Sequence, residues 1–219
     1  MNRAIIAALL AAGTLATACQ LPPTGATSGA TPAPDAAAAL RTLDTLPVAP
    51  ADTGYHYRRE DWPHWDNAPQ AGRGCDVRDA VLIAQGRNVH VSNDGKCKLT
   101  GEWTSPYDGV TVTDPGKFDV DHIVPLAEVA RSGAIENGRR VGPRLWSRAD
   151  RERYANDPSV LVAASASSNR AKGDQDPAKW IPAQGQCDYA ARWVEVKSRY
   201  ALSVDTAERQ ALAGVLRRC

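Results

Sequence analysis

Residues 117–133, KFDVDHIVPLAEVARSG, constrain the fold of this chain more than any other stretch. The first half alternates like a β-strand up to Asp121 and His122, and Pro125 then removes the backbone donor that a central strand needs in order to continue. From Leu126 the apolar residues recur with a helical period, which predicts a short helix. Because neighbouring strand residues point to opposite faces, Asp121 and His122 can share one site only where the strand ends or bends.

A second strand and a helix follow downstream and complete the pattern. Residues 159–164, SVLVAA, form an apolar run of β type. The next residues begin with serines, which cap helices, and end with Gly173, which stops them, so a helix carrying Asn169 is predicted there. Two strands crossed by one helix would bring Asp121, His122 and Asn169 together, and the fold class expected is α+β.

These three residue types suit the hydrolysis of a phosphodiester. That reaction needs a base to activate water and a cation to neutralise the charge that develops on the phosphate oxygens. Histidine has an ordinary pKa that suits a base near neutral pH, so His122 is the candidate general base. Asp121 offers an anionic oxygen and Asn169 a neutral one, and such ligands with open positions favour Mg²⁺ or Mn²⁺ over zinc. The alternative is that His122 is a buried histidine hydrogen-bonded to Asp121, without a catalytic role.

The remainder of the folded part reads as further short strands and helices. Apolar spacing predicts a helix over residues 75–85, and turn signals at NDG and YDG separate three strand candidates. Ser147 is the expected N-cap of a helix, and Asp205 with Glu208 forms a capping box for the last one. Another short helix is predicted to start at Asp176. The expected strands are residues 88–92, 97–103 and 110–113, and the other expected helices are residues 147–155, 187–200 and 205–216.

The N-terminus reads as an export signal. Residues 1–19 have a basic start, an apolar middle and small residues before Cys19, which is typical of a secretory signal peptide and too short for a stable membrane span. Cys19 stands where a bacterial lipobox carries the acylated cysteine, although Ala16 occupies a position where Leu is usual. The alternative is an ordinary secreted protein that is cleaved nearby. We therefore expect an exported chain, either anchored to a membrane through Cys19 or freely secreted.

The domain boundary is expected near Tyr55. Residues 20–54 are rich in Ala, Pro and Thr and contain no aromatic residue, so they are predicted to be a disordered tether. Residues 55–219 are predicted to form one folded domain.

The four cysteines of that domain predict two disulfides. No Cys-x-x-Cys pair suggests a zinc site, and an even number of cysteines in an exported chain favours pairing. Three connectivities are open on sequence alone. The local one joins Cys75 to Cys97 and Cys187 to Cys219, and each bond would contribute roughly 3 kcal/mol.

The motifs DVDHIVPL and ASSNRAKGD resemble those of the HNH, or ββα-metal, endonuclease superfamily. The resemblance is in particular to small secreted bacterial HNH proteins related to the C-terminal domain of Gmr-type modification-dependent restriction enzymes. It extends over residues 55–219 and includes CDVRDAVL and DPAKWIP. It implies a ββα-metal core with short antiparallel strands and flanking helices. It also implies that His122 is the general base and that Asp121 and Asn169 hold the metal ion.

The chain departs from the pattern that gives the superfamily its name. The last motif position is Asn169 rather than His, and the middle position, which usually orients the catalytic His, is not evident. Asn156 lies near the expected place but also reads as a helix terminator. A backbone carbonyl is the other candidate for the orienting group.

Several basic residues are candidates for contacts with phosphate. Arg170 and Lys172 lie on the helix of Asn169, where the alternative is a solvated face. Arg78 belongs to the resembling segment, where the alternative is a bond to a core carboxylate. A further cluster between the two motifs could line a phosphate-binding face or be solvated surface: Arg139, Arg140, Arg144, Arg148, Arg151 and Arg153.

The sequence thus predicts a metal-dependent HNH endonuclease that acts on nucleic acid outside the cytoplasm, with DNA favoured over RNA and no protein partner. The formal net charge of +1 neither supports nor excludes a nucleic-acid substrate. Two alternatives remain, a non-catalytic surface-binding module on the same fold and a hydrolase of another phosphoester.

Overall fold

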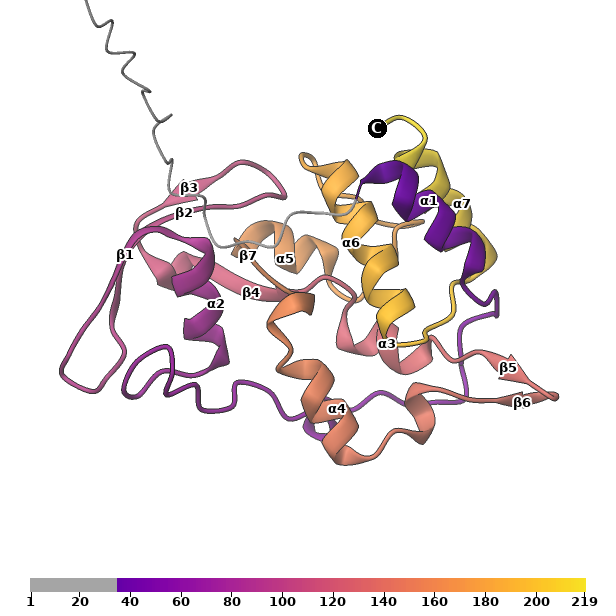
Figure 1. The fold of residues 1–219 in the computed structure, drawn as a ribbon, viewed down its shortest axis with the longest axis horizontal. Coiled ribbons are helices and arrows are strands. Elements are labelled where there is room, and N and C mark those ends of the chain that lie inside the picture. The colour runs from indigo at the N-terminus through magenta and orange to yellow at the C-terminus, as the bar shows by residue number, and fades with distance from the viewer. Residues whose placement is uncertain (1–34) are drawn as a thin grey trace, which may run out of the picture.

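The computed structural model describes residues 35–219 as an α+β arrangement of helices and short antiparallel strands (Figure 1). None of the helices in this range is long and apolar enough to cross a membrane. The strands are β1 (Arg87–Val91), β2 (Leu99–Thr104), β3 (Thr111–Val112), β4 (Phe118–His122), β5 (Ile135–Glu136), β6 (Arg139–Arg140) and β7 (Leu161–Ser165). The α-helices are α1 (Ala36–Thr45), α2 (Val77–Gln85), α3 (Leu126–Arg131), α4 (Arg148–Ala155), α5 (Ala166–Lys172), α6 (Gln186–Arg199) and α7 (Thr206–Leu216).

The predicted pair of strands crossed by a helix lies at the centre of the molecule. Strands β4 and β7 pair antiparallel, with Asp121 opposite Val162 and His122 opposite Leu161. Helix α5 follows β7 directly and packs against both strands. Ser165 makes the sharp transition possible because its hydroxyl caps α5 by accepting a hydrogen bond from the amide of Ser168. This confirms the expected core and sets α5 beside the end of β4.

A second sheet, of order β1-β2-β3, lies beside this core and is tied to α2. The buried indole of Trp103 in β2 donates a hydrogen bond to the carbonyl of Leu82 in α2, at 2.8 Å. Cys75, just before α2, is bonded to Cys97, just before β2. The predicted helix and the three predicted strands in this region are confirmed.

Helices α1, α6 and α7 form a separate layer at the other side of the molecule (Figure 1). Cys187 in the first turn of α6 is bonded to Cys219 at the end of the chain. Both local disulfide pairs are therefore present. The capping box of Asp205 and Glu208 begins α7, as predicted.

The tether expected over residues 20–54 is wrong for its C-terminal part, because residues from 35 onward are folded. The side chain of Asp35 caps α1, and Ala39 and Leu43 are buried against α6 and α7. The chain then pairs with residues before α7 through a parallel bridge between Val48 and Val204. An Ala-rich run has high helix propensity, and its small apolar stripe becomes stable only on the facing helices. Cys19 and the signal segment lie outside the described residues.

Two smaller differences also have local causes. The helix predicted at Asp176 does not form. Residues 177–179 make a tight turn instead, in which the Asp176 carboxylate accepts a hydrogen bond from the amide of Ala178 at 2.8 Å. A hairpin that the sequence reading missed joins β5 to β6. Its turn residues Asn137 and Gly138 both have positive φ, which is the geometry that favours Asn-Gly in two-residue hairpins.

Candidate active site

A pocket of about 340 Å³ lies where β4 ends, and three segments line it. The end of β4 contributes Asp121 and His122, and the end of α5 contributes Asn169 and Arg170. The third wall comes from residues 57–65, which we call the lead-in wall. The three residues predicted to carry the chemistry therefore border one cavity.

The end of β4 explains how neighbouring residues reach the same cavity. Asp121 points towards the side where α5 lies, because its carboxylate meets Lys172 of that helix. His122 points to the other side, where its ring meets the end of α4 at Ala155. The strand stops at His122, and the chain turns through Pro125 into α3. The pocket opens at this end, so it borders both faces of the strand.

His122 is buried and held in one orientation. Its Nε2 lies 2.9 Å from the carbonyl oxygen of Ala155, which can only accept, so Nε2 carries the proton and Nδ1 keeps the lone pair. The ring stacks between Trp65 and Tyr154, with centroids 6.0 and 6.1 Å away. The orienting group that the sequence left open is therefore a backbone carbonyl. Asn156 instead accepts a hydrogen bond from the amide of Asp66 at 2.9 Å.

Burial keeps this imidazole neutral. Desolvation is the main effect that lowers the pKa of His122 to about 3, and the nearby Lys172 lowers it further, while the bond to Ala155 opposes the shift. His122 is therefore unprotonated at neutral pH and has a lone pair available on Nδ1.

Asp121 is buried and bound at one of its two oxygens. Oδ2 accepts hydrogen bonds from the Tyr107 hydroxyl at 2.7 Å and from the Lys172 ammonium at 2.6 Å. Burial raises the pKa of Asp121, although Lys172 and Tyr107 act in the opposite direction. Since both donors share Oδ2, the described contacts leave Oδ1 for another ligand.

Asn169 is oriented by its own amide. Its Nδ2 donates to Asp119 Oδ2 at 3.0 Å, so the amide oxygen points away from that carboxylate. Asp119 itself lies two residues before Asp121, on the same face of β4. The oxygens that could hold a cation at this pocket are Asp121 Oδ1 on the strand and Asn169 Oδ1 on the helix, and both are hard ligands of the kind that Mg²⁺ and Mn²⁺ take.

A different cluster of possible ligand atoms does not bind metal as it stands. Cys75, Cys97 and Asp79 bring their side-chain atoms within 4.8 Å of one another. Cys75 and Cys97 are joined in a disulfide, so neither sulfur is a thiolate. The oxygen pair at the pocket fits a hard divalent cation better than this group does.

Of the three residues expected to contact phosphate, the structure places only Arg170 at the pocket. Arg170 is 78% exposed and lies 4.0 Å from Asp119. Lys172 is neither on the surface nor on a solvated face: its side chain is completely buried, and its ammonium also donates to the carbonyl of His122 at 2.6 Å. Arg78 donates to the backbone carbonyl of Phe118 at 3.0 Å at the start of β4. Its role is to hold the strand rather than a core carboxylate.

The arginine cluster between the motifs is partly consumed by contacts within the protein. Arg140 and Arg144 lie 3.7 and 3.2 Å from the buried carboxylate of Asp52. Arg151 stacks over the ring of Trp62, 5.8 Å from its centroid. Arg140 and Arg144 thus hold the segment before the lead-in wall, and Arg151 packs on the wall itself, so these three do not form a continuous phosphate-binding face.

Sequence reasoning missed four contributors to the site: Tyr107, the Ala155 carbonyl, Arg59 and Trp65. None of the four lies in either motif, and tertiary packing brings each of them to the site. The helical spacing of Asn169 and Lys172 indicated that these two residues share a face of α5, but not which way that face points.

Comparisons with known proteins place the same residues in a family. The C-terminal domain of GmrSD restriction endonucleases matches residues 76–215. A protein of Arthroderma benhamiae named "Uncharacterized secreted protein" is 39% identical over 191 residues, which is 85% of this chain and 87% of that protein. No solved structure matches. The matched family region contains both motifs, whereas the lead-in wall lies outside it.

Proposed function

Since the chain belongs to the family of GmrSD restriction endonuclease C-terminal domains, we propose that it is a metal-dependent HNH-type endonuclease that hydrolyses phosphodiester bonds of nucleic acid. The observation that carries the proposal is the meeting of His122, Asp121 and Asn169 at one pocket, with Nδ1 of His122 left as the basic nitrogen. DNA is the proposed substrate in preference to RNA.

His122 acts as the general base in this proposal. Its Nδ1 takes a proton from the attacking water, while Nε2–H remains on the Ala155 carbonyl and keeps the ring in place. Burial, and to a smaller extent the neighbouring cations, hold the pKa of the His122 imidazole low. An anionic phosphate that enters the pocket raises the pKa, because a nearby negative charge favours the protonated ring.

Asp121 and Asn169 are the residues that would hold Mg²⁺ or Mn²⁺, through an anionic and a neutral oxygen. When bound, such a cation supplies Lewis-acid stabilisation of charge on the phosphate oxygens. Lys172 and Tyr107 fix the carboxylate of Asp121 through Oδ2, which keeps Oδ1 in a constant position. Asp119 does the same for Asn169 through the amide nitrogen.

The direct test is nicking of supercoiled plasmid by the purified protein with Mg²⁺ or Mn²⁺ and with EDTA. We expect open-circular product with either metal and none with EDTA. Nicking that persists in EDTA would contradict the metal-dependent mechanism. Absence of nicking, together with release of phosphate from a small phosphoester, would point to the other hydrolase class.

Export is part of the proposal. It is supported by the signal-like residues 1–19, by the two disulfides, and by the word "secreted" in the name of the related fungal protein. Acylation of Cys19 remains a prediction, and mass spectrometry of the mature N-terminus tests it. An unmodified Cys19, or a mature chain that begins elsewhere, would contradict it.

A further inference from the structure

The lead-in wall brings a cation to the pocket that the mechanism above does not use. Arg59 lines the cavity together with His122 and Asp121, and it is exposed. It joins none of the ion pairs among residues 35–219, whereas its neighbour Arg58 bonds Asp61 at 2.9 and 3.0 Å. Arg59 thus carries a positive charge at the pocket without a carboxylate partner.

The Arg59 guanidinium contacts two side chains, the imidazole of His64 and the hydroxyl of Tyr57, and neither is a carboxylate. Arg59 Nη2 lies 2.7 Å from His64 Nε2, and His64 Nδ1 lies 2.8 Å from the carbonyl of Trp62. A carbonyl only accepts and a guanidinium only donates, so His64 is the neutral tautomer that donates from Nδ1. The imidazole and the neutral phenol of Tyr57 orient the guanidinium without neutralising its charge, so the cation stays available to an anionic ligand.

The wall is held in place by Trp65. This residue has φ of 65°, a left-handed conformation that bulky residues rarely adopt and that costs on the order of 1–3 kcal/mol. Hydrogen bonds on both sides of Trp65 hold this conformation, because Asn156 accepts one from the amide of Asp66 and donates one to the carbonyl of Pro63. The Trp65 ring in turn stacks on His122. Arg59 is therefore carried by a segment whose position is fixed relative to the proposed base.

We propose that Arg59 binds the phosphate of the substrate, in the place that sequence reasoning had given to Arg78 and Lys172. The proposal rests on the nuclease function above. An arginine presents several donors that match phosphate oxygens, and it remains charged at any working pH. Arg59 lies before residue 76, outside the region that the family model matches.

The test compares Arg59→Gln with the matched control Arg58→Gln, in the full-length mature protein. Loss of one charged hydrogen bond of about 1.5–3 kcal/mol corresponds to a fall in kcat/KM for plasmid nicking of roughly 10- to 150-fold. Arg58→Gln should stay near wild type, because Arg58 is engaged with Asp61. Thermal unfolding of both variants checks that the fold is unchanged.

A second readout separates a phosphate contact from a merely structural role. Binding of a fluorescent 20-base-pair DNA is measured in EDTA over a range of NaCl concentrations. The slope of log Kd against log salt should fall by about one for Arg59→Gln. It should equal the wild-type slope for Arg58→Gln and for Arg59→Lys, since both keep the charge at position 59. A slope for Arg59→Gln equal to that of wild type would overturn the proposal.

The two readouts also distinguish this inference from the function on which it rests. If wild type fails to nick DNA but Arg59→Gln still lowers the salt slope, the phosphate contact stands and the nuclease function fails. If wild type nicks and the two glutamine variants behave alike in both assays, the contact fails and the nuclease function stands.

Discussion

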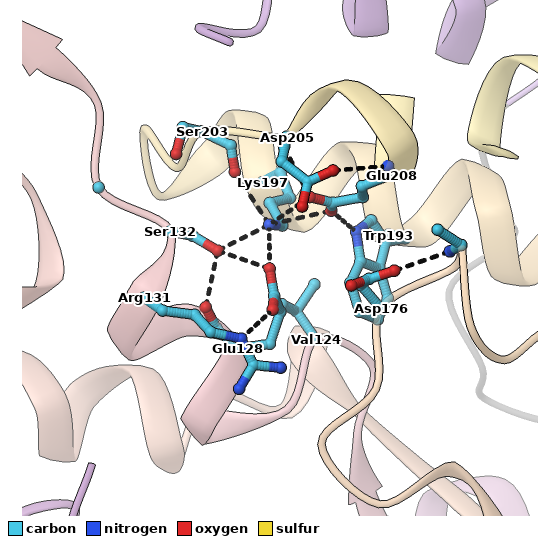
Figure 2. Close-up of polar contacts among 12 residues, drawn as sticks. Val124, Glu128, Arg131, Ser132, Asp176, Trp193, Lys197, Ser203, Asp205 and Glu208 are labelled. Carbon is cyan, nitrogen blue, oxygen red and sulfur yellow. Dashed lines mark hydrogen bonds and ion pairs between the residues drawn. The ribbon is translucent and has the colours of Figure 1, made fainter. Parts of the chain in front are cut away.

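Two lysines are completely buried in the described chain, and their surroundings differ. Lys172 lies beside the pocket, and Lys197 lies among the C-terminal helices. Lys197 Nζ is enclosed by oxygens of four residues, as Figure 2 shows. They are Glu128 at 2.8 Å, Ser132 at 2.7 Å, Ser203 at 2.9 Å and Glu208 at 2.9 Å. Lys172 has one carboxylate, that of Asp121, and one carbonyl.

The remaining oxygens of the Lys197 cluster are occupied as well. Glu128 Oε2 accepts from Arg131 Nε at 2.7 Å, and Glu208 Oε1 accepts from the indole of Trp193 at 2.5 Å (Figure 2). Burial alone would lower the pKa of Lys197, but Glu128 and Glu208 outweigh it and raise the pKa. At Lys172 burial prevails over the single carboxylate, and the pKa is lowered.

The difference indicates what each cluster can do. The Lys197 cluster is closed, because its charges and hydrogen bonds are satisfied within the protein, so it joins α3, α6 and α7 and serves the fold. Asp121 borders the pocket and, because Lys172 binds its Oδ2, keeps its other carboxylate oxygen for a further ligand. An incompletely neutralised carboxylate is what a site for a cation needs, and its cost to stability is recovered when the ligand binds.

The largest expected effect lies on the pocket side of this comparison. His122→Gln keeps a donor that can reach the Ala155 carbonyl but removes the basic nitrogen. We expect plasmid nicking to fall by about 10²- to 10⁴-fold, the range typical of a general base. His90→Gln is the control, because His90 is exposed on β1 and does not line the pocket.

His122→Ala is a poorer test of the same role. His122 packs between two aromatic rings, so truncation leaves a cavity and lowers stability in addition to activity. A His122→Gln variant that nicks at the wild-type rate would remove His122 from the mechanism and make the pocket as purely structural as the Lys197 cluster.

The next effect tests the closed cluster against the open pair. Lys197→Met leaves two buried carboxylates without their shared cation and should lower the free energy of unfolding by about 3–5 kcal/mol. Lys172→Met leaves only the Asp121 carboxylate without its cation, and this carboxylate still accepts the hydrogen bond from Tyr107. The decrease in the free energy of unfolding should therefore be smaller. Guanidinium unfolding of both variants gives the comparison.

Added metal should distinguish the two variants further. Mn²⁺ should stabilise Lys172→Met more than wild type, because a cation at Asp121 replaces the lost ammonium, and it should not restore Lys197→Met. Equal destabilisation of the two variants with no difference in their response to Mn²⁺ would break the distinction between a closed and an open cluster.

The third prediction concerns acid, and it follows from the low pKa of His122. The folded-state pKa of about 3 lies below the ordinary value of 6.5, so the unfolded chain takes up the proton more readily. The contribution of this histidine to the free energy of unfolding is therefore complete above pH 6.5. It is lost as the pH falls towards 3, with a slope of up to about 1.4 kcal/mol per pH unit. Unfolding of wild type and His122→Gln in EDTA between pH 7 and 4 measures this, and the variant should show the flatter profile. Parallel profiles would show that another group governs the acid transition.

Local signals account for the parts of the fold that were predictable. The capping residues Asp76, Ser147 and Asp205 lie within three residues of their partners, so the helices they begin could be read directly. Helix α1 could not, because its composition is that of a tether and its stability comes from α6 and α7. The Asn137–Gly138 hairpin carried a signal that was overlooked.

The site was predictable in the same graded way. Asp121, His122 and Asn169 stand in motifs, so their meeting at one pocket could be anticipated. Whether Lys172 faces solvent or β4 depends on the rotation of α5, which the sequence of the helix alone does not fix. Arg59 and Trp65 precede the motifs by more than 50 residues and reach the pocket only through the packing of Trp62 under α4.

The smallest expected effect concerns the neutral ligand, Asn169. Asn169→Ala should cost less activity than Asp121→Asn, roughly 10-fold against a larger loss, because water can replace a neutral oxygen more easily than a charged one. Asp121→Asn is preferred to Asp121→Ala, since an amide still bonds Tyr107 and fills the space. Both variants should raise the metal concentration needed for the half-maximal nicking rate.

Asn169→Asp is the more informative variant, because Asn169 donates to Asp119. The change turns that hydrogen bond into a contact between two carboxylates, which should lower stability in EDTA and make Mn²⁺ bind more tightly. Turnover should fall, because a more anionic ligand set makes the cation a weaker Lewis acid. Combining it with Asp119→Asn restores a donor to the pair, so the EDTA instability should disappear while the higher metal affinity remains. Calorimetric Mn²⁺ titration, thermal unfolding and nicking rates measure the three quantities separately. Wild-type metal affinity in every Asn169 variant would show that Asn169 is not a ligand, and the open side of the pocket would then have to be sought at Asp121 alone.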